Sequence, residues 1–227
     1  MSKKRKPKSA TPPKAQKRPE PRLYLFTPPL AGAEEDFPAT LDAVLGEADV
    51  ACVLAQSASA EPAALRALLL NLAPVARKHG AALLCADPDV AKAAGADGAH
   101  TRGAGAPLEA ALSALKPDFI VGASGIHSRH DCMEAGERDI DYLMFGDPAP
   151  DGWRPPFEDT LERVAWWAEI FNVPCVAYAG SLDEIDPLVM AGADFIALGA
   201  AIWGDPRGPV VAIRQAEDMA IAAMADQ

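Results

Sequence analysis

The chain has 227 residues, and half of them are apolar, which is enough for one domain with a sizeable core. The net charge of −11 is unevenly distributed, because residues 1–22 carry nine Lys or Arg against one Glu, whereas residues 23–227 carry twelve basic and 31 acidic residues. An acidic body argues against duplex binding, which needs positive charge, and the lack of an apolar run near 18 residues predicts no membrane-spanning helix.

Residues 1–21 are predicted to form a disordered basic tail. The segment contains five prolines and no large apolar residue after Met1, so it cannot bury enough surface to offset the entropy lost on ordering. It also lacks the apolar core of a signal peptide, and we expect a cytoplasmic protein. Two roles remain open: a solubilising arm, or an arm that contacts RNA, an acidic partner or an anionic membrane surface. Contact with nucleic acid is expected only through this tail.

From Arg22 onward, short apolar runs alternate with segments typical of helices. Most runs are continuously apolar, as expected for strands buried on both faces of a parallel sheet. The expected strands are Leu23–Thr27, Val50–Leu54, Ala81–Cys85, Gly98–Thr101, Phe119–Ala123, Tyr142–Phe145, Cys175–Ala179 and Phe195–Leu198. The expected helices are Asp36–Leu45, Glu61–His79, Asp87–Ala94, Pro107–Leu115, Arg129–Ala135, Phe157–Phe171, Leu182–Ala191 and Pro209–Ala225.

Eight such strand–helix units predict a single-domain (β/α)8 TIM barrel over residues 22–227. Glycine followed by an acidic turn leads from a helix into the next strand at Gly95–Asp97 and again at Gly192–Asp194. The alternative is a doubly wound open sheet. No G-x-G-x-x-G follows an early strand, which argues against a dinucleotide-binding fold of that kind.

Free thiols are predicted at the four cysteines, Cys52, Cys85, Cys132 and Cys175. They lie 33 to 47 residues apart and form no Cys-x-x-Cys pair, so neither a zinc site nor a disulfide framework is expected. Free thiols suit a reducing cytosol.

In a barrel of this type the active site lies at the C-terminal ends of the strands. Small residues follow the seventh and eighth expected strands, where backbone N–H groups and helix N-termini favour an anion. This pattern predicts a phosphate site, and the alternative is a pair of tight turns chosen for packing. The predicted phosphate-binding residues are Gly180, Ser181, Gly199 and Ala200.

Catalytic residues are predicted after the fifth strand. Ser124 can donate a hydrogen bond to a phosphate or carbonyl, and His127 can exchange a proton near neutral pH. The alternative for His127 is an exposed loop histidine without a catalytic role.

Other strand ends carry weaker candidates. Asp87 is a candidate ligand for Mg²⁺, although capping of the following helix is the favoured role. Arg102 is a candidate partner for an anion or else a surface residue. The loop with Trp153 and Arg154, a second candidate ligand-binding arginine, resembles a lid in its composition.

An aromatic strip on the sixth helix, formed by Trp166, Trp167 and Phe171, is predicted to be packing rather than a cofactor surface. The apolar outer-helix residues leave a homodimer open.

The ordered motifs resemble the thiamine phosphate synthase family, which includes the TenI-type thiazole tautomerases. Each motif is short, but together they follow the family's order over residues 22–215. The segments that carry the resemblance are Arg22–Pro28, Ala94–His100, Gly122–Ser124 with His127, Asp141–Gly146, Ala179–Ser181 and Ala191–Asp194.

The resemblance implies a (β/α)8 barrel. For the synthases it implies the joining of a pyrimidine pyrophosphate to a thiazole phosphate with Mg²⁺, and release of pyrophosphate. The departing charge needs metal and cationic groups.

The chain departs from the family pattern at these groups. Cys52–Ser57 lacks the Arg and Lys of the family's Gln-x-Arg-x-Lys stretch, and Cys85-Ala86 replaces an Asn-Asp pair, leaving Asp87. Gly105 falls near a later metal-binding acid, and Asp151–Arg154 replaces a lysine-bearing loop. What remains resembles the thiazole phosphate half, with Ser124, Gly180, Ser181, Gly199 and Ala200.

Three hypotheses follow, each with a phosphorylated small molecule as ligand. The first is a divergent family member that binds a thiazole-phosphate-like heterocycle in thiamine biosynthesis or salvage, with synthase chemistry disfavoured. Within it, a TenI-like tautomerase would use His127, although Ser124–Ser128 is one residue longer than the family's Ser-x-His-Ser. The second is a non-catalytic binding or regulatory barrel. The third is an unrelated small barrel enzyme with a phosphosugar or related substrate.

Overall fold

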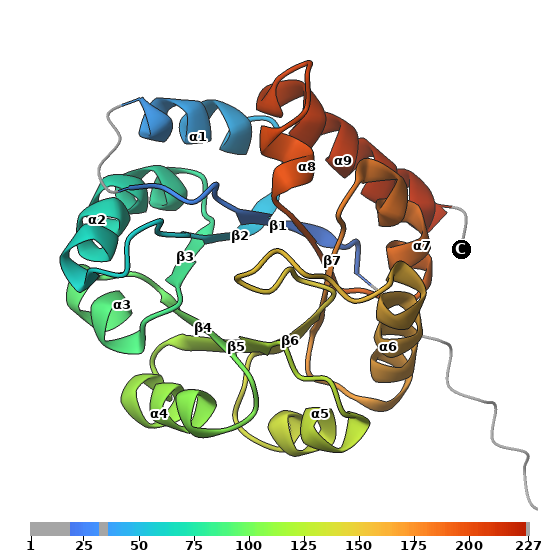
Figure 1. Cartoon of the computed structure of the whole chain (residues 1–227). Helices are drawn as coiled ribbons and strands as arrows, with labels where there is room; N and C mark the ends of the chain where they lie inside the picture. The colour runs from blue at the N-terminus through green and yellow to red at the C-terminus, as the bar shows by residue number, and fades with distance from the viewer. Residues whose placement is uncertain (1–18, 32–35, 226–227) are drawn as a thin grey trace, which may run out of the picture.

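The computed structural model describes residues 19–31 and 36–225, which form a closed barrel of eight parallel strands ringed by helices (Figure 1). Neighbouring strands pair in sequence order, and β8 pairs with β1 to close the ring. The strands are β1 (Arg22–Phe26), β2 (Val50–Leu54), β3 (Ala82–Cys85), β4 (Gly98–Arg102), β5 (Ile120–Ser124), β6 (Tyr142–Phe145), β7 (Cys175–Tyr178) and β8 (Phe195–Leu198). The predicted (β/α)8 TIM barrel is confirmed. Residues 1–18 of the expected tail lie outside the described residues.

Helices follow the strands and cover the outer face of the sheet (Figure 1). They are α1 (Phe37–Leu45), α2 (Pro62–Lys78), α3 (Pro88–Ala94), α4 (Ala106–Leu115), α5 (Arg129–Gly136), α6 (Phe157–Ile170), α7 (Ile185–Met190), α8 (Ala200–Trp203) and α9 (Pro209–Ala225). A 3₁₀ turn, η1 (Leu182–Glu184), takes the place of the first turn expected for α7. The one-turn helix α8 was not expected, because so short a segment shows no hydrophobic period.

Alternate residues of a barrel strand face the barrel interior and the surrounding helices. In β6, Tyr142 and Met144 belong to the interior cluster, whereas Leu143 and Phe145 belong to the core between the sheet and the helices. Gly122 on the neighbouring β5 makes room for the interior tyrosine, because a Cβ there would overlap the Tyr142 ring. Gly122 therefore lets the Tyr142 ring and its hydroxyl enter the barrel interior at this point.

The aromatic strip at α6 packs against the core between the sheet and the helices, as predicted. Trp167 is fully buried, stacks on Phe171 with ring centroids 3.9 Å apart, and donates a 2.8 Å hydrogen bond from its indole nitrogen to the Val173 carbonyl. Trp166 is half-buried, and the Arg129 guanidinium lies over its ring. The strip thus anchors α6 to the segment that leads into β7.

All four cysteines are buried and unbridged, which confirms the predicted free thiols. Within the described part of the chain, no helix combines the length and apolar character needed to cross a membrane.

Candidate functional site

The loop between β6 and α6 crosses the mouth of the barrel at the C-terminal ends of the strands (Figure 1). It turns at Gly146 and Gly152, whose φ angles of 84° and 85° favour glycine. A cavity of about 650 Å³ lies between the loop and the ends of β1–β4, and a smaller cavity of about 120 Å³ lies toward α5 and α6. Arg102 and Asp147 line both cavities, so these two residues mark the centre of the mouth.

A chain of hydrogen bonds leads from the barrel interior to Asp147. The hydroxyls of Tyr24 and Tyr142 lie 2.8 Å apart, and the Tyr142 hydroxyl lies 2.8 Å from His100 Nδ1. His100 Nε2 lies 2.9 Å from Ser124 Oγ, which donates a 2.9 Å bond to Asp147 Oδ2. Five side chains from four strands and one loop are thereby joined in a single buried line.

The donor and acceptor of each hydrogen bond in this buried line follow from the protonation state of His100. Burial and the nearby Arg102 charge lower the pKa of His100 to about 3, so the imidazole is neutral at pH 7. Because Ser124 gives its proton to Asp147, it accepts from His100, and His100 Nε2 therefore carries the ring proton. Nδ1 then accepts from Tyr142. All donors point toward the Asp147 carboxylate.

The surroundings of Asp147 shift its pKa in opposite directions. Burial raises its pKa, whereas Arg102 and the Ser124 hydroxyl act in the opposite direction. Arg102 Nη1 forms an ion pair with Asp147 Oδ2 and also donates a 3.1 Å bond to the Pro148 carbonyl. The arginine predicted to bind an anion is therefore paired with a carboxylate of the chain itself.

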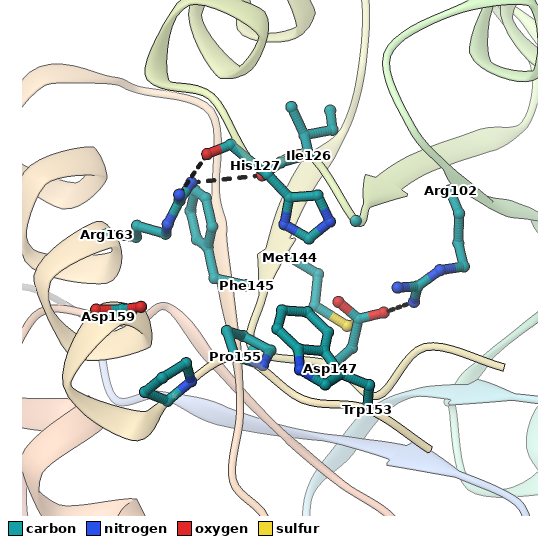
Figure 2. Close-up of a pocket in the computed structure, with 13 residues that line it drawn as sticks. Arg102, Ile126, His127, Met144, Phe145, Asp147, Trp153, Pro155, Asp159 and Arg163 are labelled. Atoms are coloured by element: carbon teal, nitrogen blue, oxygen red, sulfur yellow. Dashed lines mark hydrogen bonds and ion pairs between the residues drawn. The ribbon is translucent and has the colours of Figure 1, made fainter. Parts of the chain in front are cut away.

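The structure separates the two residues predicted to be catalytic. Ser124 is fully buried in the hydrogen-bonded chain, whereas His127 is exposed. Figure 2 shows the His127 ring in the smaller cavity with Trp153 and Asp147. The ring centroids of His127 and Trp153 lie 6.0 Å apart, and the ring planes are inclined at 72°. Arg163 borders the same cavity, where it donates to the backbone carbonyls of Ile126 and His127 (Figure 2). His127 thus shares a cavity with Asp147 rather than with Ser124.

At the end of β7, one of the predicted phosphate residues, Gly180, lies against a second arginine, Arg154. Arg154 donates from Nε to the Gly146 carbonyl at 3.0 Å and from Nη2 to Glu184 Oε2 at 3.0 Å. The Gly180 N–H donates to the same Glu184 oxygen at 2.6 Å. A Cβ at Gly180 would overlap the Arg154 guanidinium, so only glycine lets this contact form. An arginine and a backbone amide therefore converge on one oxyanion.

The remaining predicted phosphate residues lie in the turns that follow β7 and β8. Ser181 begins η1 without a side-chain cap, and Gly199 and Ala200 form the turn into α8. Gly199 also lies against Tyr178, whose ring lies under the Arg154 guanidinium at 5.2 Å.

Among the described residues, the mouth offers no set of carboxylates suited to Mg²⁺. Asp87 Oδ1 accepts the backbone N–H groups of Asp89 and Val90 at 3.0 Å each, so the residue caps α3, the role favoured from the sequence. Asp147 is committed to Arg102. In the described part of the chain, a group with possible ligand spacing is formed by His130, Asp131 and Glu134 on α5, and it borders neither cavity at the mouth.

Sequence patterns did not single out four residues of the site: His100, Tyr142, Asp147 and Glu184. Asp147 had a recognisable signal, because it directly follows Gly146 at the end of a strand, as Asp87 follows β3. The other three gave no such signal, because their hydrogen-bond partners lie far away in the sequence. His100 bonds to Tyr142 and Ser124, and Glu184 pairs with Arg154.

Comparisons with known proteins identify the family. A family model described as thiamine monophosphate synthase matches residues 23–202. The chain is 39% identical over 195 residues to a thiamine-phosphate synthase of Rhodospirillum centenum, covering 85% of this chain and 94% of the relative. It is 35% identical over 209 residues to a thiamine-phosphate synthase of Hyphomonas neptunium, covering 88% and 94%.

Solved structures show the same fold. A thiamine phosphate pyrophosphorylase from Pyrococcus furiosus matches with a TM-score of 0.74 at 23% identity, covering 90% of this chain and 97% of that chain. A 3-hexulose-6-phosphate synthase matches with a TM-score of 0.64 at 18% identity, covering 86% and 98%, so the barrel alone is shared more widely. The family model and the sequence relatives, which cover most of the chain, are specific: the chain belongs to the thiamine monophosphate synthase family.

Proposed function

We propose that the chain binds a phosphorylated heterocycle of the thiazole phosphate type at the mouth of the barrel, in thiamine biosynthesis or salvage. The observation that carries the proposal is the convergence of Arg154 and the Gly180 N–H on a single oxyanion, Glu184 Oε2. Guanidinium and backbone N–H groups are the donors that bind phosphate in proteins. In this proposal the phosphate takes over these donors from Glu184, and the turns at Ser181 and Gly199–Ala200 complete its surroundings.

Calorimetric titration with thiazole phosphate tests this site. Arg154→Ala should weaken binding about tenfold or more, since one charge-assisted contact to phosphate is lost. Arg129→Ala is the matched control, because Arg129 is exposed on α5 and lies over Trp166 rather than at the mouth. Equal affinity of wild type and Arg154→Ala would remove the basis of the proposal.

Synthase chemistry is poorly supported by the same geometry, although the relatives carry that name. Among the described residues that line the two cavities, the arginines are Arg102 and Arg163. Arg102 is paired with Asp147, and Arg163 donates to two backbone carbonyls. The Arg and Lys of the family's Gln-x-Arg-x-Lys stretch are missing at Cys52–Ser57. Losing two cationic contacts to the pyrophosphate weakens its binding by several kcal/mol, at roughly 1.5–3 kcal/mol for each charged hydrogen bond.

We therefore expect thiamine phosphate formation to be absent or slow. Purified protein supplied with the pyrimidine pyrophosphate, thiazole phosphate and Mg²⁺ can be assayed by thiochrome fluorescence. Turnover well above a no-enzyme control would show that cationic groups reach the pyrophosphate from elsewhere, and would reinstate synthase activity.

Thiazole tautomerisation is the second candidate. It is favoured by one observation, that His127 and Asp147 line the same small cavity and can both carry protons. In this role His127→Ala abolishes turnover and leaves thiazole phosphate affinity within roughly threefold of wild type. Retained affinity without turnover by either the wild type or the variant would instead indicate a non-catalytic binding or regulatory barrel.

A further inference from the structure

A third cavity lies at the opposite end of the barrel from the mouth, and we call it the basal cavity. Its walls come from the last turn of α2, the turns that lead into β3 and β4, and the first residues of β3 and β5. Its volume of about 310 Å³ is at the lower end of the range typical of small-molecule sites. It shares no lining residue with either cavity of the mouth, so a ligand bound here leaves the proposed phosphate site free.

Two charged side chains of opposite sign line the basal cavity without neutralising each other. They are Arg77 in the last turn of α2 and Asp97 in the turn before β4. No ion pair joins them, and within the described part of the chain no group pairs with the exposed Arg77 guanidinium. The cavity therefore offers one cation and one anion to a ligand.

Asp97 is fixed through one carboxylate oxygen and keeps the other for a ligand. Oδ2 accepts the Leu83 N–H of β3 at 2.8 Å, whereas no donor among the described residues bonds to Oδ1. A carboxylate accepts hydrogen bonds at both of its oxygens. Oδ1 can therefore accept from a donor that the ligand supplies.

A second aspartate in the barrel shows which donor suits this position. Asp141, in the turn before β6, accepts the Val121 N–H of β5 at 2.6 Å, which is the same contact to a neighbouring strand. The Lys116 ammonium lies 2.6 Å from the same Asp141 oxygen and neutralises the carboxylate. No ammonium of the described chain lies at Asp97, which instead faces the basal cavity. An ammonium group of a ligand would complete the equivalent arrangement.

The remaining walls suit a short hydrocarbon segment. Ala73, Ala82 and Ile120 contribute apolar side chains. A Cβ at Gly80 or Gly95 would meet no atom within 4 Å, so the space in front of both turns is open. These glycines follow the C-terminal ends of α2 and α3, where the helix dipole also favours a cation.

We propose that the basal cavity binds a small aliphatic zwitterion, such as an amino acid with a hydrocarbon side chain. Its ammonium group bonds to Asp97 Oδ1, and its carboxylate pairs with the Arg77 guanidinium, which matches carboxylate geometry. Its hydrocarbon part lies against the alanines and Ile120. This site goes beyond the thiazole phosphate function and does not depend on it.

Nuclear magnetic resonance of the ¹⁵N-labelled full-length protein tests the cavity. The probes are leucine and 6-aminohexanoate, which carry the same two charges at short and at long separation. With at least one of them, the amide resonances of Gly80, Leu83 and Gly95 should shift saturably. Hexanoate and hexylamine, which each lack one charge, should bind at least about fivefold more weakly. No saturable shift with either probe, or shifts confined to the mouth, would overturn the proposal.

Two variants test the assigned contacts. Asp97→Asn keeps an acceptor for the Leu83 N–H, and Arg77→Gln keeps a polar side chain at the end of α2. Each should weaken binding of the better probe about fivefold or more, because one charge-assisted contact is lost. The matched controls, Asp118→Asn and Arg66→Gln, change exposed charges outside the cavity lining and should leave the affinity unchanged. Wild-type affinity in either test variant would overturn the proposal, whatever the outcome at the mouth.

Discussion

Arg102 on β4 and Asp147 after β6 lie 45 residues apart in the chain, yet they form one ion pair that borders both cavities of the barrel mouth. The Asp147 side chain is 4% exposed and the Arg102 side chain is 34% exposed. A carboxylate as buried as this one is costly without a partner. The arginine therefore stabilises the charge of the loop residue as well as shaping the site.

A double-mutant cycle measures this dependence. Arg102→Met should lower the free energy of unfolding by about 1–3 kcal/mol, because it leaves Asp147 charged and unpaired. Asp147→Asn keeps a hydrogen-bond acceptor for Ser124, and the double variant should cost less than the sum of the single variants. The exposed pair Arg129–Glu162 is the control, and its coupling in urea denaturation should stay below about 0.5 kcal/mol. Equal coupling in the two pairs would contradict the expected dependence.

Acid sensitivity of the fold should depend on His100. Its pKa is lowered from 6.5 to about 3, so between these values the unfolded chain binds a proton that the folded chain does not. Stability is therefore lost as the pH falls from 6.5 toward 3, by about 1.4 kcal/mol per pH unit well below 6.5. The raised pKa of Asp147 acts in the opposite direction as the pH falls toward 3.8, because there the folded chain binds more protons.

Urea denaturation of His100→Gln across this pH range checks the effect. Its free energy of unfolding should fall less steeply with acid than that of wild type. His130→Gln should parallel wild type, since His130 is exposed on α5. Parallel curves for all three proteins would show that another group controls the acid sensitivity.

Close approach of β5 to the interior tyrosine can be tested at Gly122. Gly122→Ala should destabilise the protein by about 1–3 kcal/mol, because the added Cβ overlaps the Tyr142 ring. Gly105→Ala, where a Cβ meets no atom within 4 Å, should cost less than about 1 kcal/mol. Thermal and urea unfolding measure both, and similar costs at the two positions would mean that the barrel interior yields easily.

Glu184 should compete with the proposed phosphate ligand. Glu184→Gln removes the carboxylate that occupies Arg154 and the Gly180 N–H, so thiazole phosphate affinity should rise about threefold to tenfold. Glu162→Gln, at an exposed acid on α6, should leave the affinity unchanged. Calorimetric titration distinguishes the two, and weaker binding by Glu184→Gln would show that the carboxylate supports the site rather than blocking it.

The strands could be predicted to within about one residue because most of them are continuous apolar runs, as is typical of buried parallel strands. Position at a strand end also singled out Arg102 and Ser124, and the composition of the loop after β6 singled out Arg154. Their partners could not be predicted. Whether a carboxylate caps its own helix, as Asp87 does, or pairs with an arginine two strands away, as Asp147 does, depends on distances that only the closed barrel sets.

The buried line from Tyr24 to Asp147 shows the same limit. Tyr142 and His100 lie within strands of mainly apolar and small residues, where composition indicates packing. Their side chains meet because β4 and β6 both turn alternate residues inward, with Gly122 on the strand between them. This polar contact depends on the relative positions of β4, β5 and β6, whereas the sequence pattern of a strand describes that strand alone.

The β6–α6 loop has a thermodynamic consequence, because the same nine-residue strip that follows Asp147 borders both cavities. Its far end is fixed by Arg154 to Gly146 and Glu184, and its near end by Arg102 to Pro148. A molecule that shifts the strip from one side alters the space on the other, and linkage requires the influence to be mutual and equal in both directions. We therefore expect the affinity of each cavity for its ligand to depend on whether the other cavity is occupied.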